Sequence, residues 1–369
     1  MPKPDIRMFH TPSHSIYDNV ARYFSGFTTL RHAAHTRPDQ ARTTFFRDYW
    51  QPLCERGLLR DFSPAAGGYA KVAGAALAIA RNCADPGLAA MWLGQLLKVG
   101  LLQSYAGPEW QPAIADILDG RSLCALAISE PGVGAHPKHM KCTARLENGE
   151  YIIDGDKAYV SDGPFADWFI VLAITGQHGK LKQYSALLAH SAQNGLRISG
   201  VSHQRALGPG GHCNLVLDNC RVPHSALLGD PGNADITISR TLRTFEDALL
   251  LAPIAGALFA AADALSASID QASLVESVGQ ILCRAESVAQ LGILSAKLLD
   301  QSTPTPDLTP FIVGARSLVS EALDLLEPWL ADACQLDDLI QAIKTLNGIG
   351  AGATRARVNT LAHNYLSQR

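Results

Sequence analysis

The feature that most restricts the fold of this 369-residue chain is a hydrophobic periodicity that changes twice along its length. Up to Arg121, apolar residues recur at helical spacing, as in the stripe formed by Val72, Ala76 and Ile79. From Ser122 they alternate as in half-buried strands, and after about residue 235 the helical spacing returns. A helix–sheet–helix order in one chain predicts an α+β fold.

The two changes of period divide the chain into three expected domains. Residues 1–121 form an N-terminal helical domain, residues 122–232 a central antiparallel β domain, and residues 233–369 a C-terminal helical bundle. Apolar residues make up 47% of the chain and charged residues 18%, which supplies a large core and excludes disorder as the dominant state.

Charge and hydropathy exclude two classes of partner. The formal net charge is −3, without the excess of lysine and arginine that binding to nucleic acid requires. The uncharged stretch 248–262 is only about 15 residues long and contains Pro253 and Gly256, so we expect no membrane span. Residues 1–5 lead into no apolar segment, so we expect no secretory signal and a cytoplasmic location.

The cysteines and histidines show no ligand pattern. None of the eight cysteines forms a CxxC pair, and we expect them to be reduced and buried as small apolar side chains. The twelve histidines form no HExxH spacing. His136 and His139 lie three residues apart but in an expected loop, so we predict no metal site.

Local signals place several turns and strands. Asn148-Gly149 predicts a hairpin, and Asp154-Gly155 predicts a second turn shortly after it. We expect a buried strand at 168–173 and another strand at 215–223 that is ended by a proline. Helices should be interrupted or joined at Pro64–Gly68, Gly107-Pro108 and Pro304–Pro306, and the segment 249–259 is apolar nearly all round and should be buried.

Two motifs of the central region carry a family resemblance. Residues 123–135 read LCALAISEPGVGA, and residues 151–163 read YIIDGDKAYVSDG, followed by Ala-Asp-Trp at 166–168. This segment resembles the β domain of the acyl-CoA dehydrogenase family, with its apolar strand followed by Ser-Glu-Pro and its later Gly-x-Lys strand. Residues 221–229 resemble the exit of that domain. The resemblance implies the three-domain fold of this family and FAD as cofactor.

By this resemblance, residues at the edge of the central sheet contact the flavin. Such a ring needs a flat apolar slot and polar groups along one edge. Tyr159 would pack against the isoalloxazine and Ser161 would hydrogen-bond it. Gln280 and the turn Asn347-Gly348-Ile349-Gly350 resemble cofactor-binding positions of the C-terminal domain. The flavin or substrate entrance would be formed by Leu126, Ile128, Ser129, Gly134 and Ala135.

The family reaction makes an α,β double bond in an acyl thioester, and it requires a carboxylate that removes the α proton. Most relatives carry this glutamate near the C-terminus, but this chain has no glutamate after Glu327. In isovaleryl-type relatives the base lies on the first helix after the sheet, where Glu246 and Gly256 match the minority pattern. Asp247 replaces the family's arginine. It either raises the pKa of Glu246 further or marks an exposed acidic pair at a helix start.

A second departure concerns the phosphates of FAD. The family often has an R-x-x-F-G motif after this helix, but residues 264–283 contain no arginine and no phenylalanine. Arg284 could substitute. Losing one charge-assisted contact would weaken FAD binding by about 1.5–3 kcal/mol.

Three functions remain open at this point. The first is an FAD-dependent desaturase of acyl thioesters with Glu246 as base, which passes electrons to a transfer partner or to oxygen. The second is a degenerate partner subunit of a hetero-oligomer, and the third is a flavin oxygenase or oxidase on the same scaffold. We expect a homodimer or homotetramer, or a hetero-oligomer. Basic residues at 136–141 could face a CoA phosphate or an acidic carrier protein, or form a solvated loop.

Overall fold

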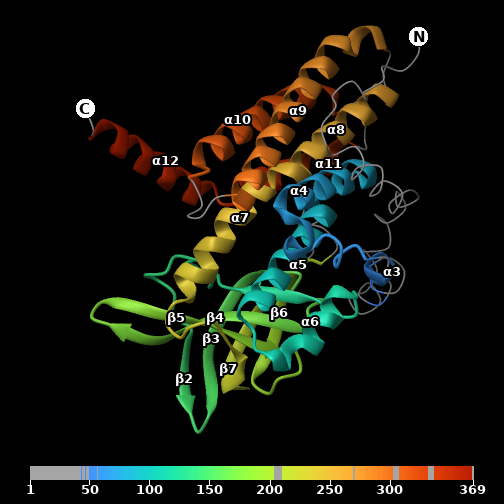
Figure 1. Cartoon of the computed structure of the whole chain (residues 1–369). Coiled ribbons are helices and arrows are strands. Elements are labelled where there is room, and N and C mark those ends of the chain that lie inside the picture. Colours follow the sequence, from blue (N-terminus) through green and yellow to red (C-terminus); the bar gives the residue numbers. More distant parts are fainter. Residues whose placement is uncertain are drawn as a thin grey trace. The chain divides into compact units, whose positions relative to one another are not determined.

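The computed structural model describes residues 43, 46, 50–55, 57–202, 210–268, 271–301, 307–330 and 336–367. It confirms the expected α+β class, with helices before and after a mainly antiparallel sheet (Figure 1). The chain contains two compact units, which we describe separately. The sheet unit comprises Ala90–Asp247 with the described part of Arg31–Ala66, and the helical unit comprises Gly67–Ala89 with the described part of Ala248–Arg369.

The sheet unit is built on eight strands. They are β1 (Cys124–Ala127), β2 (Thr143–Glu147), β3 (Glu150–Ser161), β4 (Trp168–His178), β5 (Leu181–His190), β6 (Leu196–Ser202), β7 (His212–Pro223) and β8 (Leu227–Leu228). Their order is β6-β7-β3-β2-β4-β5-β8, and β1 pairs in parallel with β4. The expected buried strand is confirmed, since residues 169–173 of β4 are at most 1% exposed, and Pro223 ends β7 as expected.

Of the two turns predicted in this region, one is confirmed and one is wrong. Asn148 and Gly149 have φ values of 51° and 84° and join β2 to β3, as a type I′ hairpin requires. Asp154-Gly155 is not a turn but lies inside β3, where the pairing with β7 shifts register. Gly155 has φ 139°, and a Cβ there would lie 2.8 Å from the Cα of Cys142. The glycine therefore marks a bulge with close backbone approach.

Helices complete the sheet unit. They are α3 (Gln51–Glu55), residues 90–105 of α5 (Pro86–Tyr105), the 3₁₀ turn η4 (Pro108–Trp110), α6 (Gln111–Leu118), the 3₁₀ turn η6 (His224–Ala226), the π-helical turn η7 (Asp235–Arg240) and most of α7 (Thr241–Leu249). Helix α5 ends before Gly107-Pro108, as expected. The first apolar stripe lies on α4 (Pro64–Cys83), which belongs mainly to the helical unit.

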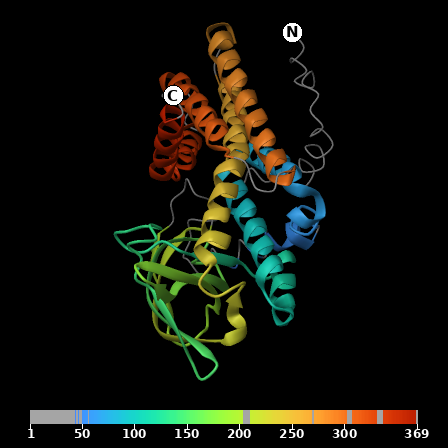
Figure 2. The same cartoon turned by 60° about the vertical axis from the view of Figure 1, so that its left-hand side comes forward.

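The helical unit contains α8 (Leu251–Ser268), α9 (Gln271–Gln301), α10 (Thr309–Leu326), the 3₁₀ turn η8 (Glu327–Trp329), α11 (Leu336–Gly348) and α12 (Ala351–Leu366). Helix α8 packs against α9 and α11, and α9 packs against α10 (Figure 2). Residues 248–262 are all buried, which confirms the expected apolar helix. By length and composition alone, the continuous stretch Asp235–Ala267 could cross a membrane, but 89% of its most apolar window is buried inside the structure, as in a core helix.

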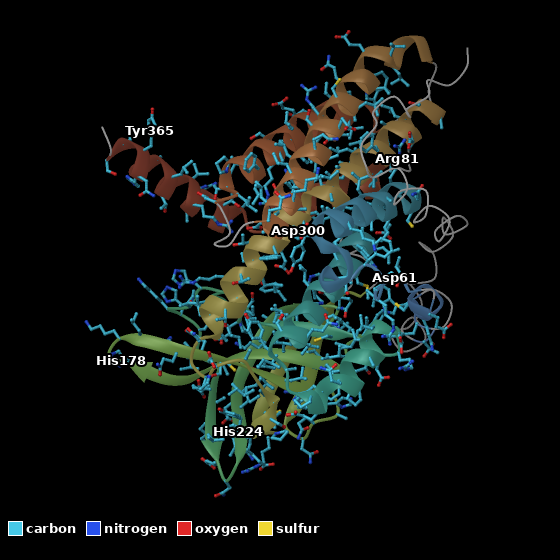
Figure 3. All side chains as sticks on the ribbon, in the orientation of Figure 1. Asp61, Arg81, His178, His224, Asp300 and Tyr365 are labelled. Carbon is cyan, nitrogen blue, oxygen red and sulfur yellow. The ribbon has the colours of Figure 1, made fainter. Side chains whose placement is uncertain are left out.

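The predicted helix breaks and the predicted burial of the cysteines were partly confirmed. The expected break at Pro64–Gly68 is a kink within α4 at Gly68, φ 80°, where the Asp300 carboxylate accepts the backbone N–H groups of Tyr69 and Ala70 (Figure 3). The linker Pro304–Pro306 lies outside the described residues. Six cysteines are buried as expected, but Cys283 is exposed.

Candidate functional site

A buried ion pair joins the two sequence motifs in the sheet unit. The Lys157 Nζ lies 2.9 Å from Glu130 Oε1 and donates to the Ile128 carbonyl at 3.1 Å. The Glu130 carboxylate also accepts the backbone N–H groups of Lys141 and Cys142 at 2.6 and 3.0 Å. The Lys157 side chain is fully buried. These bonds hold both ends of the segment between Ile128 and Cys142 in place. They are strong because the charged groups of Lys157 and Glu130 are buried and hydrogen-bonded.

This segment holds the expected entrance residues. Strand β1 ends at Ala127, so Ile128 and Ser129 follow it. The Ser129 carbonyl accepts the Ala158 N–H at 2.8 Å. Gly134 has φ 61° and exchanges two backbone hydrogen bonds with Glu130. Four of the five entrance residues are partly exposed, namely Leu126, Ile128, Ser129 and Gly134. The fifth, Ala135, is exposed.

The end of β3 presents an aromatic ring and a hydroxyl group. Tyr159 is 73% exposed and has a φ of 57°, and Asp162 has a φ of 62°. Left-handed backbone at two non-glycine residues so close together is uncommon and is found where a site constrains the chain. Between them, the Ser161 Oγ lies 3.0 Å from Nε2 of His212, which is its cross-strand neighbour in β7.

Behind this surface lies a second buried charge pair. The Asp162 carboxylate accepts hydrogen bonds from Lys98 Nζ at 2.9 Å and from Gln95 Nε2 at 3.1 Å. The side chains of Lys98 and Asp162 are only 8% and 7% exposed. Gln95 also bonds both backbone groups of Cys124 at 3.0 Å. Helix α5 is thereby tied to β1 and to the end of β3.

Glu246, the predicted base, lies on α7 within this same unit. Burial raises the pKa of Glu246, while the charges of Arg243 and Lys98 lower it and Asp247 raises it. The residue as a whole is partly exposed, whereas its carboxyl group is desolvated by burial. Helix α7 begins at Thr241 and the Asp247 side chain is fully buried near Arg243 Nε at 3.2 Å. The alternative of an exposed acidic pair at a helix start therefore does not hold.

The remaining expected cofactor residues belong to the helical unit. Gln280 lies on α9, where its side chain donates to Glu276, and Arg284 is engaged by Glu321 at 3.0 Å. Asn347 and Gly348 end α11, and Gly350, with φ 74°, precedes α12. A pocket of about 330 Å³ lies beside this turn and is lined by side chains of α10, α11 and α12.

Sequence reasoning missed four residues of the polar framework: Gln95, Lys98, Asp162 and His212. Gln95 and Lys98 carried a detectable signal, because they are polar residues three apart in an otherwise apolar helix. Asp162 lies inside the second sequence motif but was given no role there, and His212 gave no local signal. Among the described residues, no group of three His, Cys, Asp or Glu side chains is placed to hold a metal ion.

Comparisons with known proteins found similar proteins for the central domain and for the fold. Residues 125–220 match the family model "Acyl-CoA dehydrogenase, middle domain". The chain is 30% identical over 159 residues to the mitochondrial short-chain specific acyl-CoA dehydrogenase of Rattus norvegicus, an alignment covering 42% of this chain. It spans only 37% of the length of that relative.

Three solved structures share the fold over nearly the whole chain. The FAD complex of PigA has a TM-score of 0.78 at 22% identity and covers 95% of this chain and 96% of its own. The prolyl acyl carrier protein oxidase AnaB has a TM-score of 0.79 at 17% identity, covering 96% and 99%. Butyryl-CoA dehydrogenase from Megasphaera elsdenii has a TM-score of 0.73 at 16% identity, covering 93% and 98%. Residues 125–220 are thus similar to the acyl-CoA dehydrogenase middle domain, and the chain shares the fold of these solved structures.

Proposed function

We propose that the protein is an FAD-dependent oxidoreductase that introduces an α,β double bond into an acyl thioester, with Glu246 as the general base. The observation that carries this proposal is the position of Glu246 on α7, the helix that follows the sheet, where burial of its carboxyl group raises its pKa. A catalytic base for a weakly acidic C–H needs such desolvation. The middle domain and the relatives' names support the choice of cofactor and substrate class.

The residues at the end of β3 fit a flat heterocyclic ring. Tyr159 offers an exposed aromatic face, and Ser161 offers a hydroxyl group whose position is held by His212. When bound, FAD would accept the hydride that leaves the β carbon.

The chain's own side chains would carry the proton step. Glu246 removes the α proton, and its raised pKa makes its carboxylate a stronger base than an ordinary glutamate. The cations of Lys98 and Arg243 oppose the burial effect and keep a carboxylate form accessible. Since Lys98 is already paired with Asp162, only part of its charge acts on Glu246.

Anaerobic titration of the FAD-loaded protein with acyl thioesters tests this function. The wild-type protein should lose its visible flavin absorbance, and Glu246→Gln should keep FAD but lose this bleaching. Unchanged bleaching in Glu246→Gln would refute the assignment of the base. A colourless protein that does not bind added FAD would instead favour the degenerate partner subunit.

A second candidate, a flavoenzyme that acts on acyl groups bound to an acidic carrier protein, is favoured by a basic patch at 136–141 and 178–182. His136, Lys138, His139 and Lys141 are all exposed. The Lys182 Nζ donates to the carbonyls of Lys138 and Met140 at 2.9 and 2.7 Å, which joins this loop to β5. No acidic residue occurs within 131–142 or 177–183, and His178 lies at the β4–β5 hairpin (Figure 3). Such a patch suits a phosphate-rich or acidic partner.

Charge reversal distinguishes the carriers. Lys138→Glu with Lys141→Glu should reduce kcat/KM for a carrier-protein thioester more than for the CoA thioester of the same acyl group, and high salt should remove the difference. Lys297→Glu, at an exposed position on α9, is the matched control. Equal losses would indicate contact with the phosphates of CoA, and no loss would identify a solvated loop. Rapid reoxidation of the reduced flavin by air would support a flavin oxygenase or oxidase.

A further inference from the structure

The pair formed by Ser161 and His212 has a defined direction of hydrogen bonding. Their heavy atoms are 3.0 Å apart, and the two residues face each other across the antiparallel strands β3 and β7. A neutral histidine carries one ring N–H and one bare ring nitrogen, so the bond has two possible directions. In one direction Ser161 donates its only proton to the ring, and in the other it receives the ring N–H and keeps its proton.

The surroundings of the ring select between these directions. Burial lowers the pKa of His212, whereas the negative charge of Asp162 raises it and leaves a net decrease. Lys98 and Gln95 already neutralise and solvate the Asp162 carboxylate. On the β6 side the register places Ser202 opposite His212. The ring is therefore neutral at neutral pH and carries a single N–H.

The second ring nitrogen decides the position of that N–H. Nδ1 of His212 is buried and meets no hydrogen-bond partner among the described residues. A proton on Nδ1 would create a buried donor without an acceptor, which folded proteins avoid more strictly than an unused acceptor. A proton on Nε2 has the Ser161 oxygen as its acceptor. The Nε2–H tautomer thus satisfies the only donor of the neutral ring.

We propose that His212 is a positioning residue that donates Nε2–H to Ser161 and thereby directs the serine hydroxyl proton outward, toward an acceptor nitrogen of the oxidised flavin ring. This inference rests on the proposed FAD-dependent function. Ser161 is exposed at the end of β3, and its oxygen is held from behind, so its O–H has only the outward direction left. His212 itself does not contact the ligand in this arrangement.

Two measurements test the proposal. Long-range ¹H–¹⁵N correlation spectra of the histidine-labelled protein without FAD should show His212 as the neutral Nε2–H tautomer. Titration with FAD labelled with ¹⁵N at ring position N5 should give a shifted N5 resonance in the wild type. His212→Leu should move this resonance toward its position in Ser161→Ala and raise the Kd for FAD about 3- to 10-fold, the worth of one neutral hydrogen bond.

Matched variants separate positioning from a general structural effect. His212→Gln keeps an amide donor and should restore most of the affinity and the N5 signal. His224→Gln changes an exposed histidine that stacks on Tyr151 (Figure 3) and should alter neither. An Nδ1–H tautomer or an unchanged N5 signal and Kd in His212→Leu would overturn the inference. Failure of the wild-type protein to bind FAD would overturn the proposed function itself.

Discussion

Replacing Lys157 by methionine should destabilise the sheet unit strongly. The substitution keeps a long apolar stem but removes the ammonium group, which is fully buried and lies 2.9 Å from Glu130. The Glu130 carboxylate would then be left 6% exposed without its counter-charge, although the backbone N–H groups of Lys141 and Cys142 still bond it. Breaking a buried pair by removing one partner costs about 3–5 kcal/mol, and we expect this loss in the free energy of unfolding.

Urea unfolding followed by far-UV circular dichroism measures this loss by linear extrapolation. The matched control is Arg221→Met, which breaks the half-exposed ion pair with Glu150 on the neighbouring strand and should cost no more than about 1 kcal/mol. The double variant Lys157→Met/Glu130→Gln removes both charges. Its cost should fall below the sum of the two single costs by about 0.5–3 kcal/mol. A Lys157→Met cost as small as that of Arg221→Met would refute the reasoning.

Two further predictions concern stability. Because burial raises the pKa of Glu246 in the folded state, its contribution to stability is present below the ordinary glutamate pKa of about 4.3 and is lost as pH rises through the folded value. Glu246→Gln should therefore raise the free energy of unfolding at pH 7 but not at pH 4, unlike the exposed control Glu109→Gln. If Glu246→Gln changed the free energy of unfolding equally at pH 7 and pH 4, the burial of the Glu246 carboxyl group would be contradicted. Gly256→Ala should cost about 1–3 kcal/mol, because its Cβ would lie 2.3 Å from the Leu77 carbonyl oxygen. Gly279→Ala, which meets open space on α9, should stabilise slightly, and equal melting temperatures for these two variants would refute the packing argument.

The parts of the fold that the sequence predicted correctly depend on local patterns. The Asn148-Gly149 hairpin needs two positive φ angles, and these residue types supply them. The apolar run of β4 is buried because no polar side chain interrupts it. Asp154-Gly155 is also a dipeptide that favours turns, but it lies within β3 and forms a bulge where β3 pairs with β7. Tertiary contacts therefore outweighed the local signal.

The candidate site was only partly predictable for a related reason. The predictions for Tyr159, Ser161 and Glu246 came from the family motifs, and their functional roles stay predictions. The partners of these motifs come from distant segments, since Lys98 reaches Asp162 across 64 residues and His212 reaches Ser161 across 51. No local pattern encodes such pairs. The exposed thiol of Cys283 shows the same limit, because helix position and not residue type determines its exposure.

The most direct test of the central claim measures proton removal apart from oxidation. A thioester analogue whose β position carries no hydrogen is incubated with the FAD-loaded protein in D₂O, and loss of its α protons is followed by NMR. The account predicts exchange whose rate rises with pH through an apparent pKa above that of an ordinary glutamate, and no exchange with Glu246→Gln. Exchange at the wild-type rate in Glu246→Gln would contradict the account.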